Sequence, residues 1–65
     1  MESLLRLPEV ERRTGLKRSA IYQHIERNEF PPPVQLTRKA VAWPESEING
    51  WIHAKIAASR QGEAA

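Results

Sequence analysis

The segment from Val10 to Ile25, VERRTGLKRSAIYQHI, constrains the fold of this chain more than any other. It predicts two short helices joined by a turn at Gly15-Leu16, because glycine adopts the left-handed conformation that ends a helix at little cost. Leu7, Val10 and Thr14, spaced three and four apart, place the first helix over about residues 8–14. Pro8 suits its first turn, where the missing N–H costs nothing. We expect Leu16 to turn inward between the two helices.

The second predicted helix, over about residues 18–27, has two different faces. At about 100° per residue, Ala20, Ile21, His24 and Ile25 lie on one side. The other side carries polar and charged side chains, namely Arg18, Ser19, Tyr22, Gln23, Glu26 and Arg27. Two short helices of which the second exposes such a face are typical of a helix-turn-helix, which places side chains in the DNA major groove.

The length of 65 residues allows one domain at most, which we place at residues 1–59. Residues 60–65 hold no apolar side chain larger than alanine and are expected to form a disordered tail. The formal net charge is only +2, but the cations gather in the middle of the chain. They are Arg12, Arg13, Lys17, Arg18, Arg27, Arg38 and Lys39, with Glu26 and Glu29 as the acids between them. Charge alone would also fit an ordinary solvated surface.

A proline-rich entry and a weakly alternating pair of segments follow the second helix. Phe30 is expected to fold back onto the core, and residues 31–33, all proline, exclude helix and favour extended chain. Residues 34–36 and 41–43 flank the basic stretch Thr37–Ala40. This pattern predicts a two-stranded hairpin with a basic tip, a wing, over about residues 34–43.

The third predicted helix opens at Pro44. Glu45 and Glu47 in its first turn interact favourably with the helix dipole. Its apolar stripe consists of Ile48, Trp51, Ile52 and Ile56. The predicted fold is therefore mostly α with a small two-stranded β-hairpin, a winged helix-turn-helix of three helices and a wing.

The polar face of the second helix offers both kinds of contact that DNA recognition needs, to phosphates for affinity and to base edges for specificity. Arg18 and Gln23 can form two-point hydrogen bonds with guanine and adenine. The other candidate contacts are Lys17, Ser19, Tyr22, Arg27, Arg38 and Lys39, with Arg6 a weaker phosphate candidate. Each has an ordinary alternative, which is a solvated side chain or, for Tyr22, partial burial against Ile25. Their convergence beside one motif favours DNA.

Other function classes find little support. His24 and His53 are two isolated histidines without a set of acidic or thiolate partners that would complete a metal site, so we expect neither a metal site nor a cofactor. There is no Ser/His/Asp or Cys/His set and no glycine-rich phosphate loop, so we expect no enzyme and no small-molecule substrate. The chain has no cysteine and no apolar run long enough for a signal peptide or membrane span. We expect a soluble, cytoplasmic protein.

The segments RLPEV, RTGLKRSAIYQHI, FPPPVQL and AVAWPESEINGWI, in this order and spacing, resemble the AlpA family of prophage regulatory proteins. These are small relatives of excisionases and of MerR-type winged-helix domains. The resemblance covers about residues 4–56. It implies a winged helix-turn-helix that binds DNA in bacteria, is typically encoded by prophages or integrative elements, and controls transcription, often of integrase expression or of element excision.

The resemblance also implies residue roles. The second helix would be the recognition helix, so Arg18, Ser19, Tyr22 and Gln23 would contact bases and phosphates. Lys39 would match the basic wing residue. Three departures stand out: Lys17 replaces the usual serine at the helix N-cap, and Pro32 and Pro44 stand where a basic residue is common. Binding would then be weaker, or would depend more on several copies side by side.

The sequence thus predicts a sequence-specific regulator of double-stranded DNA, with residues 18–27 in the major groove and residues 34–43 on the backbone or minor groove. One alternative is a recombination directionality factor that bends attachment-site DNA. Another is a protein-interaction module that contacts an integrase or another regulator. We expect a monomer that binds repeated sites together with further copies of itself.

Overall fold

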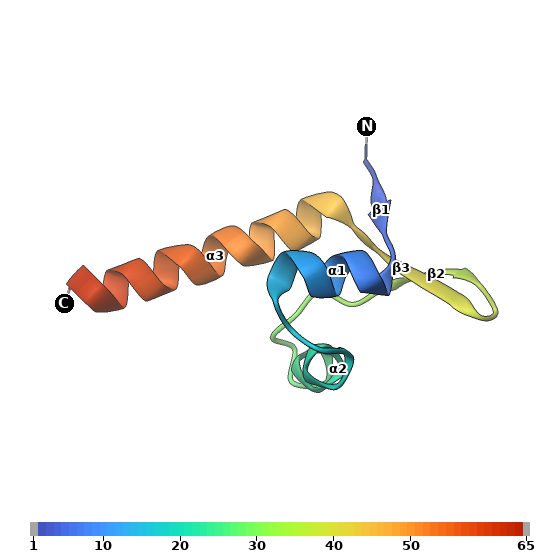
Figure 1. Cartoon of the computed structure of the whole chain (residues 1–65), viewed down its shortest axis with the longest axis horizontal. Helices are drawn as coiled ribbons and strands as arrows, with labels where there is room; N and C mark the ends of the chain where they lie inside the picture. Colours follow the sequence, from blue (N-terminus) through green and yellow to red (C-terminus); the bar gives the residue numbers. More distant parts are fainter. Residues whose placement is uncertain (1, 65) are drawn as a thin grey trace.

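The structure, a computed structural model, describes residues 2–64, with side chains described from residue 2 to 61. Its elements are β1 (Leu4–Leu5), α1 (Leu7–Thr14), α2 (Arg18–Glu26), β2 (Val34–Thr37), β3 (Ala40–Pro44) and α3 (Glu45–Ala64). Three helices lie to one side of a small antiparallel sheet, whose β2–β3 hairpin projects away from them, and most described residues are helical (Figure 1). The predicted winged helix-turn-helix fold is confirmed.

The sheet has three strands in the order β1-β3-β2, where the sequence predicts two. The added strand pairs Leu4 with Pro44 and Leu5 with Trp43, and β2 pairs on the other side of β3. Two leucines in succession are too short to show the alternation by which a strand is recognised in a sequence. The N-terminal arm is therefore part of the sheet, and it fixes the start of α1 beside the wing.

The turn between α1 and α2 has the predicted form. Gly15 adopts a φ of 77°, and its N–H donates to the carbonyl of Glu11 at 2.8 Å. The hydroxyl of Thr14 donates to the carbonyl of Val10 at 2.8 Å and accepts the N–H of Leu16 at 3.3 Å. Because α1 ends in a left-handed glycine, the chain turns at once and Leu16 packs against the core.

The core is one cluster to which every element except β2 contributes a buried residue or a direct neighbour. Its buried members are Leu5, Val10, Ile21, Phe30, Trp43 and Ile48. Trp43 is fully buried, and Phe30 folds back from the segment after α2 as predicted. The ring of Phe30 lies edge-on to that of Trp51 at 4.9 Å between centroids. The large apolar side chains therefore serve the fold.

The third helix begins at Glu45, not at Pro44 as the sequence predicts. Pro44 is the last residue of β3, and the N–H of Glu45 donates to the carbonyl of Ser3 at 2.8 Å, which continues the pairing with β1. The first turn of α3 receives a carboxylate from outside the helix: Glu2 accepts the N–H of Ser46 at 3.1 Å and also its hydroxyl. These bonds lower the pKa of Glu2 below its ordinary value.

The predicted apolar stripe of α3 is wrong at Ile56, which is 43% exposed. The helix runs away from the sheet and from α1 (Figure 1), so no other described element reaches its C-terminal half. The backbone of α3 continues to Ala64, past the domain boundary predicted at residue 59. The predicted disordered tail over residues 60–65 falls partly outside the described residues and stays a prediction.

Candidate nucleic-acid interface

The two predicted faces of α2 are confirmed. Ile21 is fully buried, and Ala20, His24 and Ile25 are half-buried. Exposed side chains on the other face are Arg18, Ser19, Gln23 and Glu26, followed by Arg27. The helix therefore presents a polar surface along its length, with Ile21 anchoring it to the core.

Tyr22 is half-buried, and its ring packs against that of Trp43. The two rings meet edge-on, with centroids 6.4 Å apart and planes at 65°. The guanidinium carbon of Arg18 lies 6.0 Å from the centroid of the Tyr22 ring, at the outer limit of a cation–π contact. Tyr22 thus joins the core to the polar face of α2.

The N-terminus of α2 has neither a side-chain cap nor an acid in its first turn. Lys17 occupies the N-cap position with φ −87° and ψ 165°, and its side chain forms no capping hydrogen bond. The first N–H groups of a helix have no partner within the helix and carry partial positive charge. This end of α2 is therefore suited to an anion.

A cleft of about 340 Å³ lies between the start of α1, the start of α2 and the wing. Its lining residues are Arg6, Leu7, Pro8, Arg18, Tyr22, Gln35, Arg38, Lys39 and Val41. Four of these side chains are cationic and none is a carboxylate. The fold therefore brings together cations from three separate parts of the chain.

The cations of this cleft lie outside the ion pairs of the described residues. Those pairs join Glu9 to Arg12 at 2.9 Å and to Arg13 at 3.0 Å, Arg13 to Glu45, and His24 to Glu29. Glu9 directly follows a residue of the cleft, but the hydrogen bond from Arg13 engages its carboxylate and lowers its pKa. Because no acid offsets the cleft cations, the potential there is positive.

The tip of the wing is held by bonds from its own strand. The side-chain amide nitrogen of Gln35 donates to the carbonyl of Thr37 at 2.6 Å and, at a long 3.4 Å, to that of Arg38. The N–H of Lys39 donates to the hydroxyl of Thr37 at 3.3 Å. Pairing between β2 and β3 is irregular between Gln35 and Thr37. These bonds hold the backbone that carries the two cations of the tip.

The structure brings some of the predicted site residues into the cleft and leaves others beside it. Arg18, Tyr22, Arg38 and Lys39 line the cleft. Lys17, Ser19 and Gln23 are exposed at α2 without lining it, and Arg27 lies at the opposite end of α2, where it follows the last helical residue.

Sequence reasoning gave Arg6 little weight and missed Gln35. The charge of Arg6 was visible, but its place beside the wing depends on β1, which the sequence does not reveal. The role of Gln35 depends on a side-chain bond to turn carbonyls, and no periodicity of the sequence signals such a bond.

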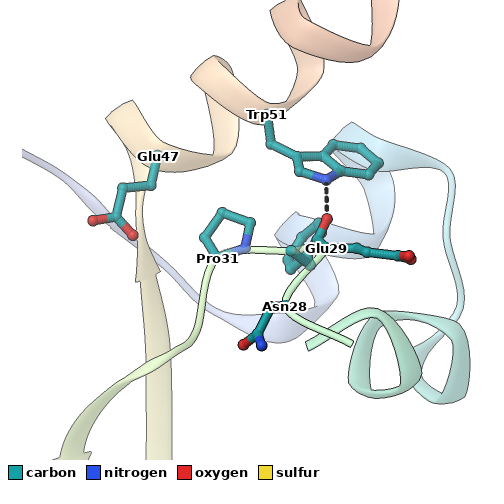
Figure 2. A pocket seen from close by; sticks show the side chains of 6 residues that line it. Asn28, Glu29, Pro31, Glu47 and Trp51 are labelled. Atoms are coloured by element: carbon teal, nitrogen blue, oxygen red, sulfur yellow. Dashed lines mark hydrogen bonds between the residues drawn. The ribbon is translucent and has the colours of Figure 1, made fainter. Parts of the chain in front are cut away.

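A second depression, of about 470 Å³, lies at the other end of α2. Figure 2 shows Trp51 on α3 directed at the segment that leaves α2, and Glu47 on the same helix with its carboxylate turned away from that segment. The indole N–H of Trp51 donates to the carbonyl of Glu29 at 2.8 Å, and Asn28 takes a left-handed φ of 59°. This depression is lined by two glutamates and by no lysine or arginine, so its charge does not suit a phosphate.

Two further findings on the described residues concern metal binding and membrane insertion. Among the side chains described, those of residues 2–61, no three His, Cys, Asp or Glu gather as metal ligands would. His24 lies 3.0 Å from a carboxylate oxygen of Glu29, and this hydrogen bond lowers the pKa of Glu29. None of the helices in the described part of the chain combines the length and apolarity that a membrane span needs.

Comparison with known proteins shows the family to which the chain belongs. The family model described as prophage CP4-57 regulatory protein (AlpA) matches residues 3–56. An uncharacterised protein of Enterobacteria phage P4, ORF88, is 48% identical over 61 residues, a match that covers 94% of this chain and 69% of that protein. The DNA-binding transcriptional activator AlpA of Escherichia coli K12 is 36% identical over 55 residues, covering 75% of this chain and 79% of that protein. The chain therefore belongs to the AlpA family of prophage regulatory proteins.

Proposed function

We propose that this protein regulates transcription by binding double-stranded DNA, with α2 in the major groove and the wing on the adjoining backbone or minor groove. The observation that carries the proposal is the cationic cleft, which lies between the wing and the N-terminus of α2 and is continuous with the polar face of that helix. A major groove about 12 Å wide admits one α-helix. The wing would then follow the strand that borders the groove.

Residues of the exposed face of α2 would read bases. Arg18 and Gln23 carry side chains that can form two hydrogen bonds with one base, and Ser19 is short enough to approach a base or phosphate near the helix start. Tyr22 is held by Trp43, so its hydroxyl would meet a phosphate in a fixed position.

Phosphate contacts would come mainly from cations around this face. Lys17 and the free N–H groups of α2 would hold the strand at one side, and Arg38 and Lys39 would hold it at the wing. Arg27 would reach the backbone near the other end of α2. Such contacts set the register of the protein on DNA, and no catalytic group is needed.

The relative from Escherichia coli, named as a DNA-binding transcriptional activator, supports a regulatory role at a promoter. A DNA partner would place the protein in the bacterial cytoplasm. A recombination directionality factor would use the same surface, with an integrase or further copies of the chain as partners. Occupancy mapping on the DNA of the element separates the two: a promoter supports the proposal, and the arms of an attachment site support the alternative.

A gel-shift comparison tests DNA binding itself. Arg18→Ala and Gln23→Ala should each weaken binding to the preferred site by about 5- to 150-fold, because one two-point base contact contributes about 1–3 kcal/mol of discrimination. Arg60→Ala and Gln61→Ala are the matched controls, since they make the same changes on the exposed end of α3.

Two results would overturn the proposal. The wild type could fail to retain duplex DNA at low salt, or the two α2 variants could bind as tightly as their controls. The second result is what a protein-interaction module predicts.

A further inference from the structure

The strand β1 gives Arg6 a fixed position beside the wing. Leu5 pairs with Trp43 of β3, so Arg6, the next residue, leaves the sheet beside the strand that forms half of the wing. The carbonyl of Arg6 then accepts the N–H groups of Glu9 and Val10 at 3.0 and 3.1 Å, which begins α1. The backbone of Arg6 is thus held by a strand on one side and a helix on the other, while its side chain is exposed and lines the cleft.

We propose that the cleft holds a single phosphate of the DNA backbone and that Arg6 is a main contact of that phosphate. The proposal rests on the proposed function and assigns a ligand group to one part of its surface. Arg6 lines the cleft together with Arg38 and Lys39 of the wing tip. A guanidinium presents two N–H groups in the geometry that matches two phosphate oxygens.

The lining of the cleft favours a phosphate over a base edge. Base edges are distinguished by a mixture of donors and acceptors. Arg6, Arg38 and Lys39 supply donors and three positive charges, and a neutral base edge balances none of that charge, whereas Arg18 is assigned to a base. The side-chain amide nitrogen of Gln35 donates to the carbonyl of Thr37, so Gln35 holds the wing tip in place. An anion with several acceptor oxygens is the group that this set of side chains satisfies.

The position of the cleft explains what such a contact would do. It lies between the wing and the N-terminus of α2, so a strand bound there would be held while α2 enters the groove beside it. A contact to phosphate carries no sequence information, so its loss should weaken binding to every duplex alike. This separates Arg6 from Gln23, whose loss should matter most at the preferred site.

Salt dependence measures this contact directly. Fluorescence anisotropy with a short labelled duplex of random sequence, repeated over a range of salt concentrations, compares the wild type with Arg6→Ala, Arg6→Lys and the control Arg60→Ala. Arg6→Ala should bind about tenfold more weakly, and the slope of log K against log salt should fall by about 0.9 in magnitude, the value for one phosphate. Arg6→Lys should keep the slope and recover part of the affinity, and Arg60→Ala should change neither.

The outcomes distinguish this inference from the function on which it rests. If Arg6→Ala matches Arg60→Ala in affinity and slope while Arg18→Ala still weakens binding, the inference fails and the proposed function stands. A loss of affinity without a change of slope also overturns it. If the wild type binds no duplex, both fail. Thermal unfolding of Arg6→Ala should match that of the wild type, because the structure uses the backbone of Arg6 for the fold and leaves its side chain exposed.

Discussion

The indole N–H of Trp51 on α3 donates to the carbonyl of Glu29, in the segment that leaves α2, at 2.8 Å (Figure 2). The indole N–H of Trp43 on β3 donates to the carbonyl of Pro31 in the same segment at 2.9 Å. The two tryptophans therefore attach the segment that follows α2 to α3 and to β3. The orientation of α2 relative to the wing depends on these two bonds as well as on the burial of Ile21.

Replacing each tryptophan by phenylalanine keeps an aromatic ring and removes the hydrogen bond. Trp51→Phe should lower the free energy of unfolding by about 1 kcal/mol, the net contribution of one hydrogen bond. Trp43→Phe should cost more, about 2–3 kcal/mol, because Trp43 is fully buried and the smaller ring also leaves a void. Urea unfolding followed by far-ultraviolet circular dichroism measures both free energies of unfolding. A larger decrease for Trp51→Phe than for Trp43→Phe would contradict the roles given to the two tryptophans.

Two glycine substitutions should change stability in opposite directions. Gly15 has a φ of +77°, and no neighbouring atom lies within 4 Å of where a Cβ would stand. Gly15→Ala therefore meets no clash but forces alanine into the left-handed region. That should cost about 1–2 kcal/mol. Gly50 lies inside α3 with equally open space, so Gly50→Ala should stabilise the protein by about 0.5–1 kcal/mol. Thermal unfolding checks the signs: a Gly15→Ala variant as stable as the wild type would be inconsistent with the left-handed turn, and a less stable Gly50→Ala variant would contradict the prediction for α3.

Stability should depend on pH through Glu2. The bonds from Ser46 lower its pKa in the folded state below the ordinary value of 4.5. The stabilisation is therefore present above that value and is lost as the pH falls through the folded pKa. Glu2→Gln should be less stable than the wild type at neutral pH, and the difference should shrink in acid. Glu26→Gln makes the same change at an exposed site on α2, and urea midpoints that fall in parallel for both variants would refute the role of Glu2.

Much of this fold was readable from the sequence because its signals are local. Gly15 predicts the end of α1, and the four-residue spacing of Ile21 and Ile25 predicts the inner face of α2. The prolines before Val34 predict the extended chain that leads into the wing. The parts that were missed depend on partners distant along the chain or on where the domain ends. A strand of two leucines shows no period, and Ile56 fits the apolar stripe but lies beyond the reach of the core.

The candidate site was only half readable for the same reason. The polar face of α2 follows from helical spacing alone. The cleft needs Arg6 from the N-terminal arm and Gln35 from the wing, and only the pairing of β1 and β2 with β3 brings them to one place. Charge in the sequence marked Arg6, but nothing in the sequence ranked it above the other arginines.

A glutamate at position 35 should weaken DNA binding strongly. Gln35→Glu puts a carboxylate among four cations and removes the amide that donates to Thr37, so it both offsets the positive potential and loosens the wing tip. We expect at least about tenfold weaker binding to a short duplex at low salt. Gln61→Glu makes the same chemical change on the far part of α3 and should reduce affinity little. Equal effects of the two substitutions would show that net charge, and not the cleft, governs binding.

Chemical-shift mapping tests the proposed binding face most directly. A short duplex is titrated into the ¹⁵N-labelled chain, and the backbone amides and the two indole N–H groups are followed. We predict that the largest changes fall on Arg18–Gln23 and on the wing tip at Thr37–Lys39, while the indole N–H of Trp51, at the other end of α2, stays nearly still. Changes centred on Trp51, Asn28 and Glu29, with the exposed face of α2 unaffected, would contradict the proposed mode of DNA binding.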